Sequence, residues 1–262
     1  CEMASLGITT VEAKSGYGLS YEDELKLLEV ARELSHRQPV ELISTLLAAH
    51  IVPPEFKEDR KGYVRMVVDE LLPEVARRKL SRFCDAFVED TAFTVDEARE
   101  ILTAAKALGL GAKLHADQLS DGGGGLLAAE VDAVSADHLE HASDETLTRL
   151  SERNVVAVAL PFAALYTFEK PLEARRFIER GVRVAVATDY NPGSAPSYHL
   201  PMALLLACTL SRMTPHEALK GATLYAARAV GLETRIGSLE PGKQADFVVH
   251  DAPSANHWLY QF

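Results

Sequence analysis

The chain has 262 residues, of which 47% are hydrophobic, and its 27 Lys and Arg against 38 Asp and Glu give a formal net charge of −11 at pH 7. This composition excludes a disordered chain, a collagen-like repeat and a lone mini-domain. The excess of acid argues against nucleic acid or a membrane surface as a partner, because both are bound by clustered Lys and Arg. We therefore expect a small-molecule ligand.

Cysteine usage and hydropathy point to a cytoplasmic protein. Cys1, Cys84 and Cys208 form no CxxC pair, which is typical of a reducing compartment rather than of a disulfide framework. No stretch reaches about 18 apolar residues, and the opening CEMASLG lacks the features of a signal peptide. Residue 1 is not Met, and the first dozen residues resemble the interior of a domain, so we expect the chain to be a fragment.

Short β-branched runs alternate with amphipathic helical stretches, which is the pattern of a parallel sheet wrapped by helices. Seven strands are predicted, at 8–13, 40–48, 83–88, 112–115, 133–136, 155–160 and 183–188. Helices are expected after Ser20 and after Thr94, where Glu97 has capping-box spacing, and a further helix from Thr214 to a closing Gly231. Turn residues at 240–242 then precede a predicted short strand at 246–250, which we expect to leave the main sheet for a small β layer.

The predicted fold is an α/β TIM barrel, a (β/α)8 fold, whose first strand is missing. Such barrels use about 250 residues, but seven strands do not close an eight-stranded ring. An open doubly wound sheet is the competing fold, and its signature is absent because no GxGxxG follows the first strand.

Polar side chains follow three of the predicted strands, numbered two to eight, at the ends where barrel enzymes place their catalytic groups. His115 ends strand five, His138 strand six and Asp189 strand eight, so the three can converge above the barrel axis. Imidazole and carboxylate suit Zn²⁺ or Fe²⁺. A bound metal can lower the pKa of water from about 15.7 to about 7, which points to a hydrolase.

Several of these residues also have purely structural interpretations. A single histidine at a strand end is often hydrogen-bonded for stability, and we expect Asp117 and Asp137 to cap helices or orient a ligand. The glycines at 122–125 lack the Lys-Ser/Thr of a phosphate loop and are expected to permit close packing, while Cys84 is expected in the core.

Two further strand ends carry candidate ligand-binding groups. Tyr17 lies between Gly16 and Gly18, which would let the backbone bend and aim the phenol inward, although a surface turn explains the pattern equally well. His50 precedes Pro53 and is either a site residue or a loop anchor.

Four motifs together resemble the imidazolonepropionases of the amidohydrolase superfamily. They are EAKSGYGL at 12–19, HADQ at 115–118, SADHL at 135–139 and TDYNPGS at 188–194. The resemblance extends over nearly the whole chain. It implies a metal-dependent amidohydrolase barrel at 1–235 and a segment at 236–262 that returns to a small β-sandwich.

The resemblance also implies roles for individual residues. His115 and Asp189 would be metal ligands, with Asp189 managing the protons of the attacking water and His138 lying beside the reacting centre. Gln118 would contact the ring of the substrate, and Tyr17 and His50 would hold it. Asn191, Gly193 and Ser194 would bind parts of substrate or product.

The implied reaction is hydrolysis of the ring C–N bond of 4-imidazolone-5-propanoate to N-formimidoyl-L-glutamate in histidine degradation. One divalent ion, Zn or Fe, and a homodimer are the further expectations from the resemblance. The alternatives are another cyclic-amide hydrolase, a heterocycle deaminase, or a non-catalytic barrel that binds a small carboxylate.

One departure from the family pattern stands out. The family's first strand carries an HxH pair that supplies two more metal ligands, with a substrate-binding Arg after it, and this sequence contains no HxH. We therefore expect an N-terminally truncated chain with weak metal affinity and little or no activity.

Overall fold

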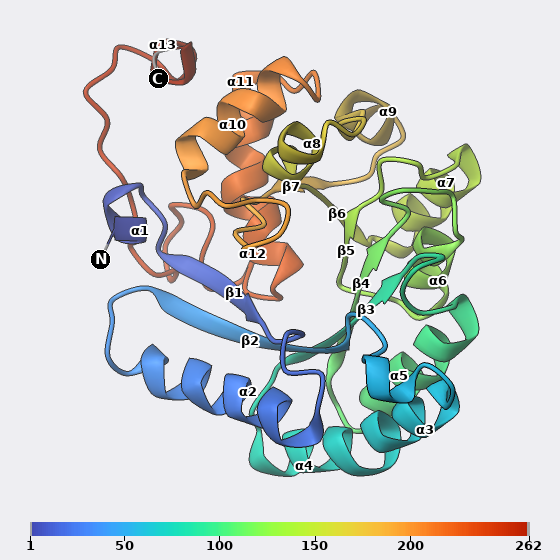
Figure 1. Ribbon diagram of the computed structural model, residues 1–262. Helices are drawn as coiled ribbons and strands as arrows, with labels where there is room; N and C mark the ends of the chain where they lie inside the picture. The colour runs from blue at the N-terminus through green and yellow to red at the C-terminus, as the bar shows by residue number, and fades with distance from the viewer. Residues whose placement is uncertain (1, 261–262) are drawn as a thin grey trace.

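The computed structural model describes residues 2–260, and Cys1 lies outside them. Seven parallel strands form a single sheet in the order β1-β2-β3-β4-β5-β6-β7, and the sheet curls with helices along its outer face (Figure 1). The strands are β1 (Thr10–Lys14), β2 (Glu41–Ala49), β3 (Phe83–Val88), β4 (Gly111–Ala116), β5 (Ser135–His138), β6 (Val156–Ala159) and β7 (Val184–Val186). All seven predicted strands are confirmed, with bounds that shift by a few residues.

Consecutive strands are neighbours throughout, as expected of βα units that wind in one direction. The helices are α1 (Glu2–Ser5), α2 (Tyr21–Ser35), η1 (Pro54–Phe56), α3 (Arg60–Arg65), η2 (Met66–Leu71), α4 (Leu72–Arg78), α5 (Val95–Ala107), α6 (Gly124–Glu130), α7 (Asp144–Arg153), α8 (Pro161–Thr167), α9 (Ala174–Glu179), α10 (Leu200–Thr209), α11 (Pro215–Lys220), η3 (Gly221–Tyr225), α12 (Ala226–Ala229) and α13 (Ala255–Tyr260).

The predicted helix starts are confirmed. Ser20 accepts a hydrogen bond from the Asp23 amide, and Thr94 and Thr214 each form a complete capping box with the glutamate three residues later. The last predicted helix is a continuous helical run over α11, η3 and α12, with a π-helical turn in the middle that the sequence pattern did not reveal.

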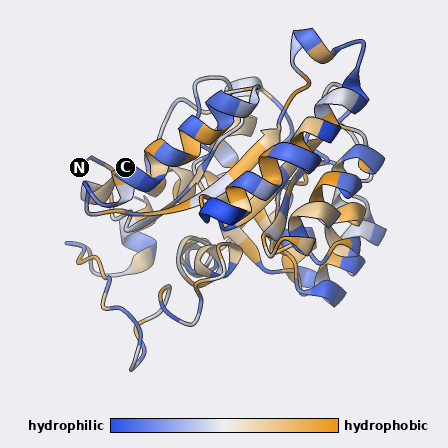
Figure 2. Ribbon diagram, turned by 90° about the horizontal axis from the view of Figure 1, so that it is seen from below, coloured by the Kyte–Doolittle hydropathy of each residue, from blue (hydrophilic) through white to orange (hydrophobic). Residues whose placement is uncertain are grey.

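Successive side chains of a strand point to opposite faces of the sheet, so the core has two layers, one on each face. In β3, Cys84, Ala86 and Val88 belong to the large cluster between sheet and helices, which confirms Cys84 as a core residue. A smaller cluster on the inside of the curl includes Val156, Val158 and Ala185. In Figure 2 the strands in the middle are mostly apolar, whereas the helices around them carry both polar and apolar residues.

The sheet does not close within residues 2–260, because β1 pairs only with β2 and β7 pairs only with β6. The chain therefore forms a seven-stranded partial barrel, as the strand count predicted. The division of the chain at residue 235 stays a prediction.

The strand predicted at 246–250 is not formed. These residues have no regular secondary structure, and Phe247 and Val249 are largely exposed. A strand requires a hydrogen-bonded neighbour. The segment instead passes close to Gly7, where Val248 makes a side-chain contact.

Within residues 2–260, no helix combines the length and apolar character that a bilayer crossing requires.

Candidate active site

A cavity of about 920 Å³ opens at the carboxyl ends of the strands and continues into the curl of the sheet. Eight of the nine predicted site residues line it, namely Tyr17, His50, His115, Gln118, His138, Asp189, Asn191 and Ser194. Gly193 is not part of the lining, because it lies in the outer part of the turn after β7. The structure thus brings together residues that are up to 177 positions apart in the chain (194 − 17).

Left-handed backbone conformations mark three of these strand ends. Asp117, His138 and Asp189 have φ values of +49°, +74° and +52°. Residues other than glycine rarely adopt this conformation, and such strain concentrates at functional sites. It turns the chain sharply at the point where each strand meets the cavity.

Aromatic rings form a row along the lining of the cavity, from the loop after β1 to the end of β5. The ring centroids of Tyr17 and His50 are 5.3 Å apart, and those of His50 and Phe87 are 6.1 Å apart. Phe87 then lies 6.1 Å from His115, which lies 5.5 Å from His138. Neighbouring rings are tilted or edge-on to one another, at interplanar angles of 41–70°, so the row forms an uneven, partly apolar surface on which a small ring can be held.

The loop that carries Tyr17 is held by Glu24 of α2, a fully buried residue. Its carboxylate accepts hydrogen bonds from the amides of Gly16, Gly18 and Leu19 at 2.8–3.1 Å. His50 Nδ1 lies 3.0 Å from the Gly16 carbonyl oxygen, so His50 both anchors this loop and lines the cavity. Tyr17 itself is 57% exposed and forms part of the rim.

The loops after β4 and β7 are organised by side chains of their own motifs. Asp117 accepts hydrogen bonds from the Gly124 and Gly125 amides, which confirms it as a helix cap, and burial raises the pKa of Asp117 to about 6. A side chain at Gly124 would meet Ala116 at 2.7 Å, so the expected close packing is confirmed there. Asn191 accepts hydrogen bonds from the Gly193 and Ser194 amides and so shapes its own turn.

His138 is buried beside Glu140, with 3.8 Å between its Nδ1 and Oε2 of the glutamate. Burial by itself would lower the pKa of His138, but Glu140 and the nearby Asp189 raise it above its ordinary value. Burial lowers the pKa of His50. The pKa values of the two imidazoles are thus shifted in opposite directions within one cavity.

Five charged side chains lie together on the inner face of the curled sheet, and all but Asp85 line the cavity. Lys14 Nζ lies 2.6 Å from Asp85 Oδ2 and 2.5 Å from Asp137 Oδ2. Lys113 Nζ lies 2.6 Å from Glu12 Oε2. Asp137 therefore does not cap a helix, the first of the two roles expected of it, because its side chain points inward from β5 onto Lys14.

The lysine and its partners shift one another's pKa values. Burial would lower the pKa of Lys14, but Asp137, Asp85 and Glu12 raise it well above its ordinary value. Burial would raise the pKa of Asp85, but His115 and Lys14 hold it far below its usual range. Lys14 and Asp85 therefore stabilise each other's charged form inside the barrel.

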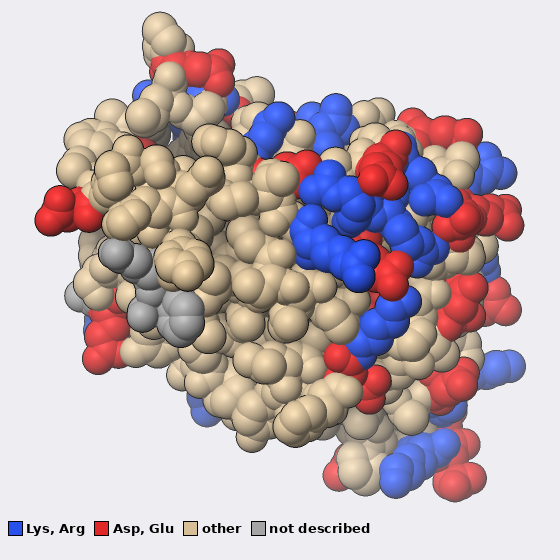
Figure 3. Space-filling model, turned by 90° about the horizontal axis from the view of Figure 1, so that it is seen from above, with Lys and Arg blue, Asp and Glu red and all other residues tan. Residues whose placement is uncertain are grey.

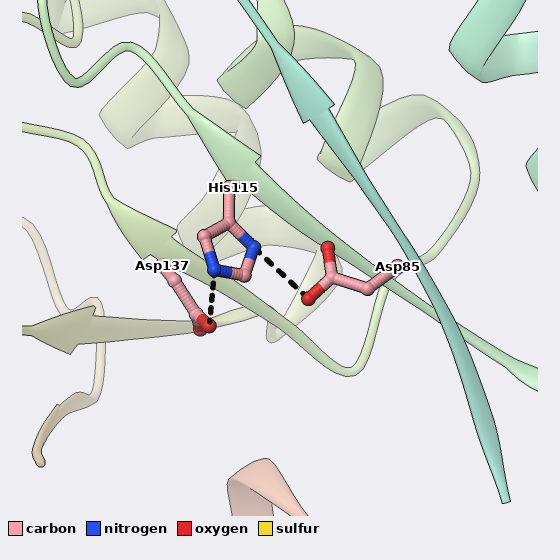
Figure 4. Close-up of side chains that lie close together, drawn as sticks. All are labelled: Asp85, His115 and Asp137. Atoms are coloured by element: carbon pink, nitrogen blue, oxygen red, sulfur yellow. Dashed lines mark ion pairs between the residues drawn. The ribbon is translucent and has the colours of Figure 1, made fainter. Parts of the chain in front are cut away.

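Figure 4 shows His115 between two carboxylates, Asp85 from β3 and Asp137 from β5. His115 Nδ1 lies 3.0 Å from Asp85 Oδ2, and its Nε2 lies 4.0 Å from Asp137 Oδ2. One donor atom from each residue falls within 4.8 Å of the other two. Oδ1 of Asp85, Nδ1 of His115 and Oδ1 of Asp137 are buried and have no hydrogen-bond partner among the described residues.

This donor set fits a divalent cation in its chemistry, because imidazole and carboxylate are the ligands of Zn²⁺ and Fe²⁺. Asp189, the predicted partner of His115, lines the same cavity but is not part of this compact group. The ligand pair of His115 and Asp189 stays a prediction. The sequence pattern missed Asp85, although an aspartate inside the apolar run FCDAFV was a signal.

Residues 85–261 match the amidohydrolase family. Among curated relatives, the chain is 54% identical to the imidazolonepropionase of Geobacillus thermodenitrificans, over 98% of this chain and 60% of that protein. It is 49% identical to the imidazolonepropionase of Fusobacterium nucleatum, over 99% of this chain and 63% of that protein. The chain thus spans about 60% of the length of these relatives.

Solved structures with the same fold include a mutant of atrazine chlorohydrolase from Arthrobacter aurescens complexed with zinc and atraton. It has a TM-score of 0.76 at 16% identity, over 98% of this chain and 65% of that one. Guanine deaminase from E. coli has a TM-score of 0.70 at 17% identity, over 90% of this chain and 59% of that one. At these identities the likeness establishes the fold alone, and the family match over residues 85–261 shows that the chain belongs to the amidohydrolase family.

Proposed function

We propose that this chain carries the catalytic barrel of an imidazolonepropionase. The reaction is hydrolysis of the ring C–N bond of 4-imidazolone-5-propanoate to N-formimidoyl-L-glutamate, a step of histidine degradation. The observation that carries the proposal is the convergence of residues from all four motifs on one cavity, in a chain 54% identical to an imidazolonepropionase. In this proposal residues 1–235 form the barrel, and 236–262 lead out of it.

The cavity wall suits the proposed substrate. The ring of 4-imidazolone-5-propanoate is small, planar and polar at its edge, and a single ring of the row from Tyr17 to His138 can stack on it or meet it edge-on. Gln118, Asn191 and Ser194 line the cavity and supply amide and hydroxyl groups for its polar edge and its propanoate tail.

His115 and Asp189 would hold one divalent ion, Zn or Fe. Activation of a water molecule is the chemistry that such an ion supplies when it is bound. Asp189 would accept a proton from the attacking water, and His138, whose pKa is raised, would hold a proton for the departing ring nitrogen. The buried position of His138 keeps bulk water from competing for that proton.

A chimera tests the proposal directly. The 262 residues replace the matching segment of the Geobacillus thermodenitrificans relative, whose own remaining residues complete the protein. We expect the purified chimera to hydrolyse 4-imidazolone-5-propanoate, as measured by appearance of N-formimidoyl-L-glutamate, with the unmodified relative as the positive control.

Hydantoin and guanine, offered in parallel, represent the cyclic-amide hydrolases and the heterocycle deaminases. Turnover of either one without turnover of imidazolonepropanoate would contradict the proposed substrate. A folded chimera that binds imidazolonepropanoate but hydrolyses none of the three would favour a small-carboxylate-binding protein.

A further inference from the structure

The barrel interior holds more negative than positive charge in one connected cluster, which we call the interior charge cluster. It comprises three carboxylates, Glu12, Asp85 and Asp137, and two ammonium groups, Lys14 and Lys113. Lys14 is its centre, because Nζ of Lys14 contacts all three carboxylates, at 3.7, 2.6 and 2.5 Å respectively. The single ammonium group of Lys14 thus compensates one carboxylate on its own strand, β1, and one each on β3 and β5.

Two of the carboxylates that contact Lys14, those of Asp85 and Asp137, also flank His115. Their donor atoms already lie close to the spacing of a metal site, because a tetrahedral zinc ion with bonds of about 2.1 Å holds its ligand atoms about 3.4 Å apart. His115 Nδ1 and Asp85 Oδ2 are 3.0 Å apart, and all three donor atoms are within 4.8 Å of one another.

Unused bonding capacity in this group points to a cation. Asp85 is fully buried, yet its Oδ1 has no partner among the described residues, and the same holds for Nδ1 of His115. Buried polar atoms of this kind are normally paired. The His115 contact with Asp85 is therefore close without being a well-directed hydrogen bond.

We propose that the Lys14 ammonium is a built-in cation that occupies a divalent-metal site formed by Asp85, His115 and Asp137. While Lys14 is present, it excludes a metal ion from the donor group that Nδ1 of His115 forms with the two carboxylates, and it leaves Nε2 of His115 as the nitrogen at which an ion can bind. The side chain thereby limits how many ions the barrel takes. This inference concerns metal occupancy alone and does not depend on the substrate proposed above.

Lysine suits this role better than arginine does. Its ammonium is a compact point charge with three donors on a flexible stem, so it fits between two carboxylates that lie close together. Removing the charge leaves the two buried carboxylates without their ion-pair partner, which is strongly unfavourable. A divalent cation restores the balance and satisfies the unpartnered atoms as well.

The substitution Lys14→Met tests the inference, because methionine keeps much of the volume and removes the charge. After dialysis against Co²⁺, we expect the variant to retain one ion more per chain than the unmodified protein, as measured by elemental analysis. A new visible absorption band of protein-bound Co²⁺ should accompany that ion. The temperature of unfolding of the variant should rise with Co²⁺ concentration more than that of the unmodified chain.

Lys113→Met is the matched control. Lys113 is more fully buried than Lys14 and is also paired with a carboxylate, but its contacts are Glu12 and the Ala229 carbonyl oxygen, with no imidazole. We expect this variant to gain no ion. In the triple variant Lys14→Met, Asp85→Asn and Asp137→Asn, the additional ion should be lost again.

Folding failure is also informative. If Lys14→Met does not fold alone, we expect it to fold when Co²⁺ is present during refolding, as followed by circular dichroism. The inference is overturned by a folded Lys14→Met chain that gains no ion, by an equal gain in Lys113→Met, or by failure to fold both with and without Co²⁺. None of these outcomes bears on the hydrolysis of imidazolonepropanoate by the chimera.

Discussion

Charged residues inside the curled sheet come from strands that are otherwise apolar. Asp85 lies in the run FCDAFV and Lys113 in GAKLHA, and both are fully buried. Hydropathy identifies such runs as buried strands but does not say which partners compensate a charge within them. The partner of Asp85 is Lys14, 71 residues away in the sequence.

Glu24, beside the loop that carries Tyr17, is a second buried charge whose partners the sequence alone does not reveal. It lies in the first turn of α2, where an acidic residue is expected because its negative charge interacts favourably with the positive end of the helix dipole. The structure adds a second role, since its carboxylate accepts three amide hydrogen bonds from the preceding loop. Only the fold brings that loop back over the start of the helix.

Two substitutions at the cavity separate metal binding from proton transfer. In the chimera, Asp189→Ala should abolish turnover and reduce the bound metal, whereas His138→Ala should lower turnover by about 10²–10⁴-fold and retain the metal. Steady-state assays with elemental analysis distinguish the two. His36→Ala, at an exposed position outside the cavity, is the control. Loss of metal in both cavity variants would show that His138 is itself a ligand.

Between elements, an ion pair joins α9 and α11, and its acidic residue, Glu217, also caps α11. Glu217 completes the capping box of α11 and binds Arg175 of α9, with 2.6 Å between Oε2 and Nη2. Figure 3 shows this upper face, where Lys and Arg side chains gather with acids beside them. Arg176 and Arg180 of the same region both contact Asp144 at the start of α7.

The Arg175 side chain lowers the pKa of Glu217 to about 2. The folded-state pKa lies below that of the unfolded chain, so the stabilisation is present above pH 4.5 and is lost as the pH falls toward about 2. Because the pair is partly exposed, we expect Glu217→Gln to cost about 1 kcal/mol at pH 7. Urea unfolding of both proteins should show this difference, and it should shrink on acidification. A difference that stays constant with pH would contradict the assignment.

The whole molecule is a curled parallel sheet with two edges. Strands in its middle have a neighbour on each side, whereas β1 and β7 have one each within residues 2–260. Both edges border the large cavity, since Thr10 of β1 and Val186 of β7 are among its lining residues. The two strands that have only one hydrogen-bonded neighbour within residues 2–260 therefore lie beside the cavity.

Hydrogen exchange should reveal this gradient. We expect the amides of β3, β4 and β5 to be protected longest, and those of β1 and β7 to exchange at least tenfold faster, because edge strands open without breaking the core. Mass spectrometry of peptides from the exchanged chain measures the order. Uniform protection across all seven strands would contradict it.

The sequence by itself determined the seven strands, the capped helix starts and the three strand ends that carry His115, His138 and Asp189, because local periodicity and capping are written in neighbouring residues. It misplaced the strand at 246–250, since pairing depends on a partner that hydropathy does not reveal. Only the tertiary structure decided that Asp137 points onto Lys14, that Asp85 joins His115, and that Glu24 holds the Tyr17 loop. Those contacts join residues brought together by the curl of the sheet, and a charge buried in one strand becomes favourable only when another strand supplies its counter-charge.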